Sequence, residues 1–258
     1  MIAEANGIRI GLACYTYETD GTAGDKALNF IPMKAADAPL INSFDYSHLD
    51  LFYSELEESM AQMEEQGADA VVLFIHWGNE YQTTQNATQS DIAQKLCDLG
   101  VDVIIGGHPH VVQPVELLES TTDESHKTVC LYSMGNAVSN QRRQNISMKT
   151  GHTEDGVMFS VTFSRYSDGT VILESADCLP LWVNMRTNSD TGRREYNILP
   201  LDDQIEDWKS QFDLTDSTLE SCHASFERTM AIVGDGMKEV SEYLATNTAA
   251  VEAELGVD

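Results

Sequence analysis

The chain has 258 residues, which is enough for one domain with an appendage and a large buried core. Its 15 Lys and Arg residues stand against 42 Asp and Glu residues, which gives a formal net charge of −27. Because so acidic a surface repels phosphate backbones and anionic bilayers, we expect no binding to nucleic acid or to membrane surfaces, and we expect a cationic partner or bound metal ions instead.

The sequence shows no membrane span, export signal or disulfide framework. No run of about 18 apolar residues occurs, and the N-terminal residues lack a basic region followed by a long apolar stretch. The five cysteines are odd in number, far apart and free of CxxC spacing, which argues against disulfides and thiolate zinc sites. On these grounds the chain as given is expected to be cytoplasmic.

The first part of the chain predicts alternating strands and helices. Strands are predicted at residues 8–15, 70–75 and 101–105, and helices at residues 48–66 and 90–99. Gly67 is a natural stop for the first helix, and Ser90 is the expected N-cap of the second. The strand at 70–75, the helix at 90–99 and the strand at 101–105 form a strand-helix-strand unit, which predicts an α/β fold with parallel strands.

The second part of the chain no longer alternates strands and helices. Strands are predicted at residues 128–133, 156–164, 170–178, 181–186 and 196–199, and the sequence SDG predicts a hairpin turn after Ser167. Beyond Pro200 the pattern is helical and acidic. The candidate packing residues there are Trp208, Phe212, Leu219, Phe226, Ile232 and Tyr243. We therefore expect an α/β body over residues 1–205 and an acidic helical extension over residues 206–258.

Three histidines follow two of the predicted strands. His76 comes directly after the apolar run at 70–75, and His108 and His110 follow the run at 101–105. Residues at the carboxyl ends of neighbouring parallel strands converge, and open α/β sheets bind their ligands there. Neutral imidazole is the commonest metal ligand near neutral pH. The spacing therefore predicts a metal site at this edge of the sheet.

The HPH sequence suits a site with two metal ions. Its two imidazoles can face different ions while Pro109 restricts the turn, and Gly106 and Gly107 let the backbone bend as it leaves the strand. In metallohydrolases of phosphoesters, two ions about 3.5–4 Å apart clamp the attacking and leaving oxygens. Glu80 lies close enough in sequence to His76 to orient a ligand or to handle a proton. The alternative for His76 is a hydrogen-bonded structural histidine.

Polar residues after a later strand form a second candidate group. Asn136, in the sequence YSMGN, either hydrogen-bonds a ligand oxygen or fixes its loop. Arg142 and Arg143 are a rare basic pair in an acidic chain, and guanidinium groups suit carboxylates and phosphates. These three residues are therefore the candidate substrate-binding residues. The alternative for the arginines is that they offset acidic neighbours such as Glu154 and Asp155.

Four sequence motifs, in this order, resemble those of a known family. They are HWGNEY at 76–81, GGHPHVVQP at 106–114, YSMGN at 132–136 and TEDGV at 153–157. Over roughly residues 5–200 the chain is similar to the CapA family of bacterial capsule-synthesis proteins, which is linked to poly-γ-glutamate synthesis and export. That family resembles the calcineurin-like metallophosphoesterases in fold, a β-sandwich flanked by helices.

The resemblance implies divalent metal ions as cofactors, with His76 and His108 on one ion and His110 on a second. Family members are commonly membrane-anchored or exported, in contrast to the cytoplasmic expectation above. The family opens with an acidic ligand, a Gly-Asp motif and an Asn-His motif, none of which is found here, since Gly24-Asp25 follows the wrong strand. We therefore expect the N-terminal part of the fold to be missing, metal binding to be poor and activity to be low.

Three functions remain open from the sequence. The first is a metal-dependent hydrolase of phosphoester or related bonds, acting on phosphorylated envelope material in capsule or poly-γ-glutamate biosynthesis. In it Glu80 handles a proton, while Arg142 and Arg143 grip the anion. The second is a non-catalytic component that binds or exports an anionic polymer with the same fold. The third is a metal peptidase that cleaves γ-glutamyl amide bonds.

Overall fold

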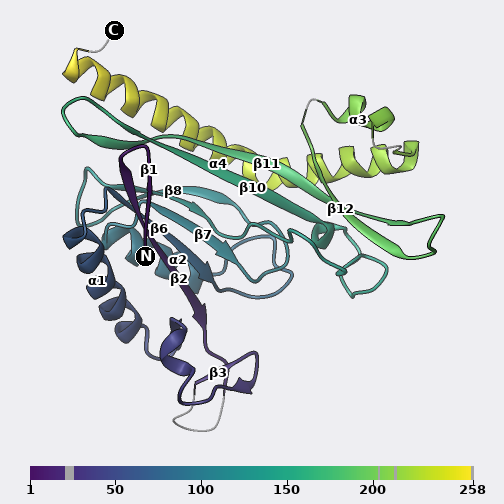
Figure 1. Ribbon diagram of the computed structural model, residues 1–258, viewed down its shortest axis with the longest axis horizontal. Helices are drawn as coiled ribbons and strands as arrows, with labels where there is room; N and C mark the ends of the chain where they lie inside the picture. The colour runs from purple at the N-terminus through teal and green to yellow at the C-terminus, as the bar shows by residue number, and fades with distance from the viewer. Residues whose placement is uncertain (21–25, 203, 212–213, 257–258) are drawn as a thin grey trace.

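The computed structural model describes residues 1–20, 26–202, 204–211 and 214–256. Its centre is a seven-stranded sheet with the order β1-β2-β6-β7-β9-β8, in which β5 also pairs with β2. These strands are β1 (Ile2–Ala5), β2 (Ile8–Tyr17), β5 (Ser43–Phe44), β6 (Ala70–His76), β7 (Val103–Gly107), β8 (Val115–Glu119) and β9 (Lys127–Leu131). β2, β6, β7 and β9 are parallel, so the predicted α/β class is confirmed (Figure 1).

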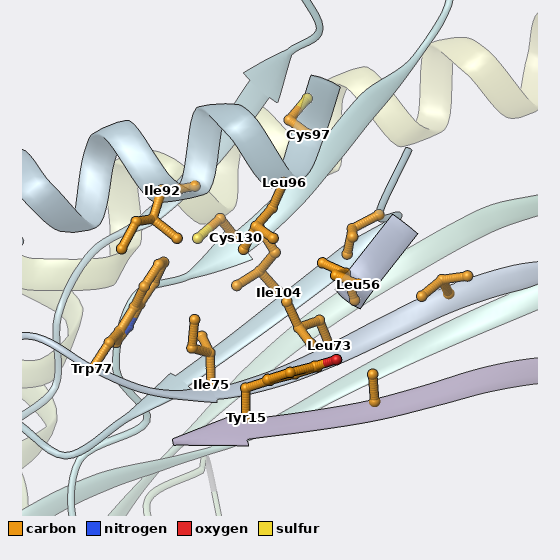
Figure 2. Packing of buried hydrophobic residues seen from close by; sticks show 14 of the residues in the cluster. Tyr15, Leu56, Leu73, Ile75, Trp77, Ile92, Leu96, Cys97, Ile104 and Cys130 are labelled. Carbon is orange, nitrogen blue, oxygen red and sulfur yellow. The ribbon is translucent and has the colours of Figure 1, made fainter. Parts of the chain in front are cut away.

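Two helices cover one face of the central sheet. They are α1 (Leu49–Glu65) and α2 (Ala87–Asp98). Ile92 and Leu96 of α2 point toward Ile104 of β7, and Leu56 of α1 lies over the same core (Figure 2). All four side chains are fully buried. The apolar residues at helical spacing therefore form the face that packs on the sheet, as predicted.

Helix α2 begins earlier than the sequence analysis predicts. Its N-cap is Asn86 and not Ser90, because Asn86 and Gln89 form a capping box. Asn86 Oδ1 accepts from the N–H of Gln89 at 2.9 Å, and Gln89 Oε1 accepts from the N–H of Asn86 at 3.1 Å. These two bonds satisfy amides that the first turn of a helix otherwise leaves unpaired.

A three-stranded antiparallel sheet packs on the other face. It consists of β10 (Asp155–Arg165), β11 (Val171–Thr187) and β12 (Arg194–Pro200). Val103 and Ile105 of the central sheet form a core with side chains of β10 and β11, among them Phe159. The two strands predicted at 170–178 and 181–186 are one strand, β11. Pro180 fits inside it because its backbone polar groups face the end of β12, where strand pairing stops at Leu181, so its missing N–H falls just beyond that ladder.

The remaining elements lie outside these two sheets. They are β3 (Ala27–Leu28), β4 (Ile31–Pro32), the 3-10 turns Ala38–Leu40 and His152–Glu154, α3 (Ile205–Gln211) and α4 (Asp216–Leu255). β3 and β4 form a two-stranded ribbon. The Gly24-Asp25 pair lies outside the described residues. Within the described residues, no helix is long and apolar enough to cross a bilayer, and the five cysteines are free thiols.

Helix α4 packs along β11 and β8 (Figure 1). Its buried residues recur at helical spacing and share one core with strand residues such as Val115 and Leu131. They include Val233, Met237, Val240 and Leu244. Of the predicted packing residues, Leu219, Ile232 and Tyr243 are partly buried but Phe226 is 41% exposed. Phe212 and the side chain of Trp208 lie outside the described residues.

Replacing each of two glycines of α4 with alanine should have opposite effects on stability. A Cβ atom at Gly236 would lie 1.8 Å from the carbonyl oxygen of Val115, whereas a Cβ at Gly234 would meet only Met230 Cε, at 3.7 Å. We expect Gly236→Ala to lower the free energy of unfolding by about 1–3 kcal/mol, because the helix must move off β8. Gly234→Ala should raise it by up to about 1 kcal/mol, because alanine favours helix. Urea unfolding followed by circular dichroism measures both, and equal effects would contradict the packing described here.

Candidate functional site

One cavity lies at the carboxyl ends of β2, β6 and β7. It has a volume of about 310 Å³ and is lined by Thr16, Tyr17, Leu28, Asn29, His76, Glu80, His108 and His110. The strand register explains this convergence, since His76 lies opposite Thr16 on one side and opposite Gly107 on the other. The structure therefore brings all three predicted histidines and Glu80 to one place.

His76 and His108 form a close pair in this cavity. His76 Nε2 lies 3.1 Å from His108 Nδ1, and the Tyr17 hydroxyl lies 3.1 Å from His108 Nε2. Burial, together with the nearby His76 and His110, lowers the pKa of His108 to about 4. Burial and His110 also lower the pKa of His76. Both imidazoles are therefore neutral at pH 7, with lone pairs available to a metal ion or a proton.

The loop that carries the second and third histidines has an unusual backbone. His108 and His110 have φ angles of 99° and 59°, in the region that favours glycine. Such conformations cost about 1–3 kcal/mol each and persist only where the surroundings fix them. Two backbone hydrogen bonds hold this loop. The carbonyl of Gly107 accepts from the backbone N–H of Trp77 at 3.1 Å, and the carbonyl of Pro109 accepts from the backbone N–H of Tyr81 at 2.8 Å.

The sequence predicted a backbone bend at Gly106 and Gly107, but the bend begins at the next residue, His108. Gly106 and Gly107 are part of strand β7, and neither has a positive φ. The space at Gly106 is needed for a different reason, which is the close approach of the Tyr132 carbonyl and the Trp77 indole. Trp77 itself is fully buried in the core beneath the site.

Asn136 fixes its loop and contacts His110. Its Nδ2 donates to the carbonyls of His110 at 3.0 Å and Thr153 at 2.9 Å, and its Oδ1 lies 3.0 Å from His110 Nδ1. The side chain is only 8% exposed. Of the two roles that the sequence left open for Asn136, these contacts match the structural one. On the far side of the ring, His110 Nε2 lies 3.9 Å from Glu80 Oε1.

Arg142 and Arg143 do not line the histidine cavity. Arg142 Nη2 donates to Glu154 Oε2 at 3.0 Å, and Arg143 Nε donates to Glu154 Oε1 at 3.1 Å. Arg142 and Glu154 are both buried. These contacts match the alternative that the sequence left open for the arginines, in which they offset an acidic neighbour. Both guanidinium groups therefore already share the Glu154 carboxylate, Arg142 from a buried position and Arg143 with 37% of its side chain exposed.

Tyr17 is the site residue that the sequence analysis missed. It belongs to β2, which was predicted to end at residue 15 and in fact extends to Tyr17. Its ring lies nearly parallel to that of His76, with centroids 5.8 Å apart. The rule that identified His76, convergence at the carboxyl ends of parallel strands, identifies Tyr17 as well once the strand is extended by two residues.

The histidine pair fits part of a metal ligand set. Two imidazoles on one tetrahedral Zn²⁺ have nitrogens about 3.3 Å apart, given Zn–N bonds of about 2.0–2.1 Å. The nitrogens of His76 and His108 are 3.1 Å apart, and both rings are neutral at pH 7. Within the described residues, however, no group of three His, Cys, Asp or Glu side chains is placed to hold a metal ion. The donors are thus of the right kind, but only two of them lie close together.

The fold and the site define the class of this protein: it is an α/β protein with histidines gathered at the carboxyl ends of its parallel strands. Within that class, the chain belongs to the bacterial capsule synthesis protein family PGA_cap, whose model matches residues 1–141, more than half of its length. The resemblance to CapA proteins that the sequence motifs indicated is confirmed.

Two curated relatives are similar over shorter segments. The PGA biosynthesis protein CapA of Bacillus subtilis (strain 168) is 42% identical over 74 residues, which is 29% of this chain and 18% of the relative. The capsule biosynthesis protein CapA of Bacillus anthracis is 32% identical over 114 residues, which is 44% of this chain and 23% of the relative. The matched region therefore spans about a fifth of the length of these relatives.

Proposed function

We propose that this chain acts in capsule or poly-γ-glutamate biosynthesis, with the histidine cavity as a divalent metal site for hydrolysis of phosphoester or related bonds. The convergence of His76, His108, His110 and Glu80 in one cavity carries this proposal. The names of the two Bacillus relatives support the biosynthetic role. The three-stranded sheet packed on the central sheet is what a metallophosphoesterase-type sandwich would require.

In this proposal the residues of the cavity have separate roles. His76 Nε2 and His108 Nδ1 would hold one divalent ion, and His110 Nε2 a second. Bound ions would supply Lewis-acid polarisation of the bond to be cleaved. Glu80, half-exposed at the rim and 3.9 Å from His110 Nε2, would accept or donate a proton at Oε1.

The charge of the cavity makes anion binding dependent on metal. Among its described lining residues there is no Lys or Arg, and the chain has a net charge of −27. A phosphorylated substrate would therefore meet a repulsive field unless cations occupy the site. We expect inorganic phosphate to bind the chain only when divalent metal is present.

Metal titration of the His108→Ala variant tests the site directly. Isothermal titration with Zn²⁺ or Mn²⁺ should show weak binding to the unmodified chain, since no three ligands converge in the part of the chain that the structure describes. His108→Ala should lower the affinity more than about tenfold, because even outer-shell partners of a metal site cost about 10–100-fold. The control is His223→Ala, an exposed histidine of α4 that pairs with Glu206. Equal affinity in both variants, or no binding to the unmodified chain, would contradict the proposal.

Turnover assays then separate the kinds of chemistry. The chain is tested with an aryl phosphodiester and with a γ-glutamyl anilide, each with and without the metal. Metal-dependent hydrolysis of the phosphodiester that is lost in His108→Ala supports the proposed activity. Hydrolysis of the γ-glutamyl amide alone would replace it with a peptidase. Tight binding of poly-γ-glutamate by a chain that binds no metal would replace it with a polymer-binding role.

A further inference from the structure

The orientation of the Asn136 amide is fixed by its surroundings. Its Nδ2 faces the carbonyl oxygens of His110 and Thr153, at 3.0 and 2.9 Å, and lies 3.4 Å from Gln141 Oε1. All three are acceptors. Exchanging the oxygen and nitrogen of the amide would put Oδ1 against three other oxygens and leave two carbonyls without a donor. Oδ1 must therefore be the atom that faces His110.

This orientation determines which nitrogen of His110 carries hydrogen. Asn136 Oδ1 can only accept, and it lies 3.0 Å from His110 Nδ1. A lone pair on Nδ1 at that distance would be repelled, so Nδ1 must carry the hydrogen and donate it. In the neutral ring the lone pair is then on Nε2. That atom is on the cavity side, 3.9 Å from Glu80 Oε1.

The neighbours of His108, by contrast, do not fix its tautomer. Its Nε2 faces the hydroxyl of Tyr17, which can donate or accept, and its Nδ1 faces His76 Nε2, which can do the same. The neighbours of His108 therefore allow either neutral form. Of the three cavity histidines, only His110 has, among the described contacts, an acceptor on one side whose orientation backbone carbonyls hold.

We propose that Asn136 is a positioning residue that holds His110 in its Nδ1–H tautomer and so presents Nε2 to the cavity as the atom that binds a divalent cation. Outer-shell partners generally fix the tautomer and ring orientation of metal-binding histidines. The cation part of this inference rests on the proposed function, whereas the tautomer of His110 does not.

The tautomer is measured by long-range ¹H–¹⁵N correlation spectra of the uniformly ¹⁵N-labelled, metal-free full chain at pH 8. The expected result is a protonated Nδ1 and an unprotonated Nε2 for His110, the reverse of the form that predominates for free histidine in water. His110→Ala assigns the signals. A protonated Nε2 in the unmodified chain would overturn the proposal without the need for any variant of Asn136.

Substitutions then connect the tautomer to Asn136. Asn136→Ala removes the acceptor and should convert His110 largely to the Nε2–H form, with a loss of Zn²⁺ affinity of about 10–100-fold. The control is Gln141→Ala, since Gln141 contacts the same amide but not His110. It should leave both the tautomer and the affinity unchanged. An unchanged His110 spectrum in a folded Asn136→Ala would also overturn the proposal. If the Nδ1–H form is found but no metal binds, the proposed function fails and the role of Asn136 in setting the tautomer stands.

Discussion

Glu154→Ala is expected to lower the free energy of unfolding by about 3–5 kcal/mol, the usual cost of removing one partner of a buried ion pair. Glu154 is 1% exposed and accepts from Arg142 Nη2, from Arg143 Nε and from the Arg143 N–H. Its removal leaves the buried guanidinium of Arg142 without its carboxylate. Urea unfolding at pH 7, followed by circular dichroism, gives the difference.

An exposed ion pair with similar geometry provides the control. Arg186 Nε and Glu195 Oε2 are 3.0 Å apart, the same distance as Arg142 Nη2 and Glu154 Oε2. Because the Arg186 and Glu195 side chains are 50% and 34% exposed, Glu195→Ala should lower the free energy of unfolding far less than Glu154→Ala does. Similar costs for both substitutions would show that burial does not make the Glu154 contacts important.

The Glu154 effect should also depend on pH. Burial alone would raise the pKa of Glu154, but the hydrogen bonds from Arg143 and the charges of both arginines outweigh it, so the pKa lies below the usual 4.5. A carboxyl with a lowered pKa in the folded state contributes stability that is present above 4.5 and is lost as the pH falls through the folded value. The stability difference between the unmodified chain and Glu154→Ala should therefore shrink below about pH 4.5. A difference that stays constant down to pH 3 would contradict this assignment.

The sequence predicted the parts of the site that depend on strand ends. β6 and β7 are nearly continuous apolar runs, so both strands, and with them the positions of His76 and His108 near their carboxyl ends, were predicted from the sequence, although the predicted ends fall one and two residues short. β8 was missed because its five residues, VELLE, are short and half polar. Its position is set by pairing with β9 and by the helix α4 that covers it. Both elements come later in the chain than β8.

The roles of polar side chains could not be predicted in the same way. A basic pair such as Arg142 and Arg143 suits an internal carboxylate as well as an external anion, and only the folded position of Glu154 decides between them. Asn136 is similar, because its use depends on the carbonyl acceptors of His110 and Thr153, which are 26 and 17 residues away in the chain. Periodicity carries no information about such contacts.

Gly106→Ala is expected to be the most damaging small substitution near the site. A Cβ atom there would lie 1.9 Å from the Tyr132 carbonyl oxygen and 2.5 Å from Trp77 Nε1. These two atoms are themselves hydrogen-bonded at 2.9 Å, and both residues are fully buried. The backbone of Tyr132 cannot yield without separating β7 from β9. We expect a loss of about 3 kcal/mol or more in the free energy of unfolding, from overpacking together with the broken hydrogen bond.

The neighbouring glycine separates this packing effect from the general effect of a methyl group in the strand. A Cβ atom at Gly107 would meet nothing within 4 Å, and its φ is not positive. Gly107→Ala should therefore leave the stability unchanged or raise it by up to about 1 kcal/mol, through the lower entropy of the unfolded chain. Urea unfolding of both variants measures this. A mild effect of Gly106→Ala would mean that Trp77 and Tyr132 can move apart.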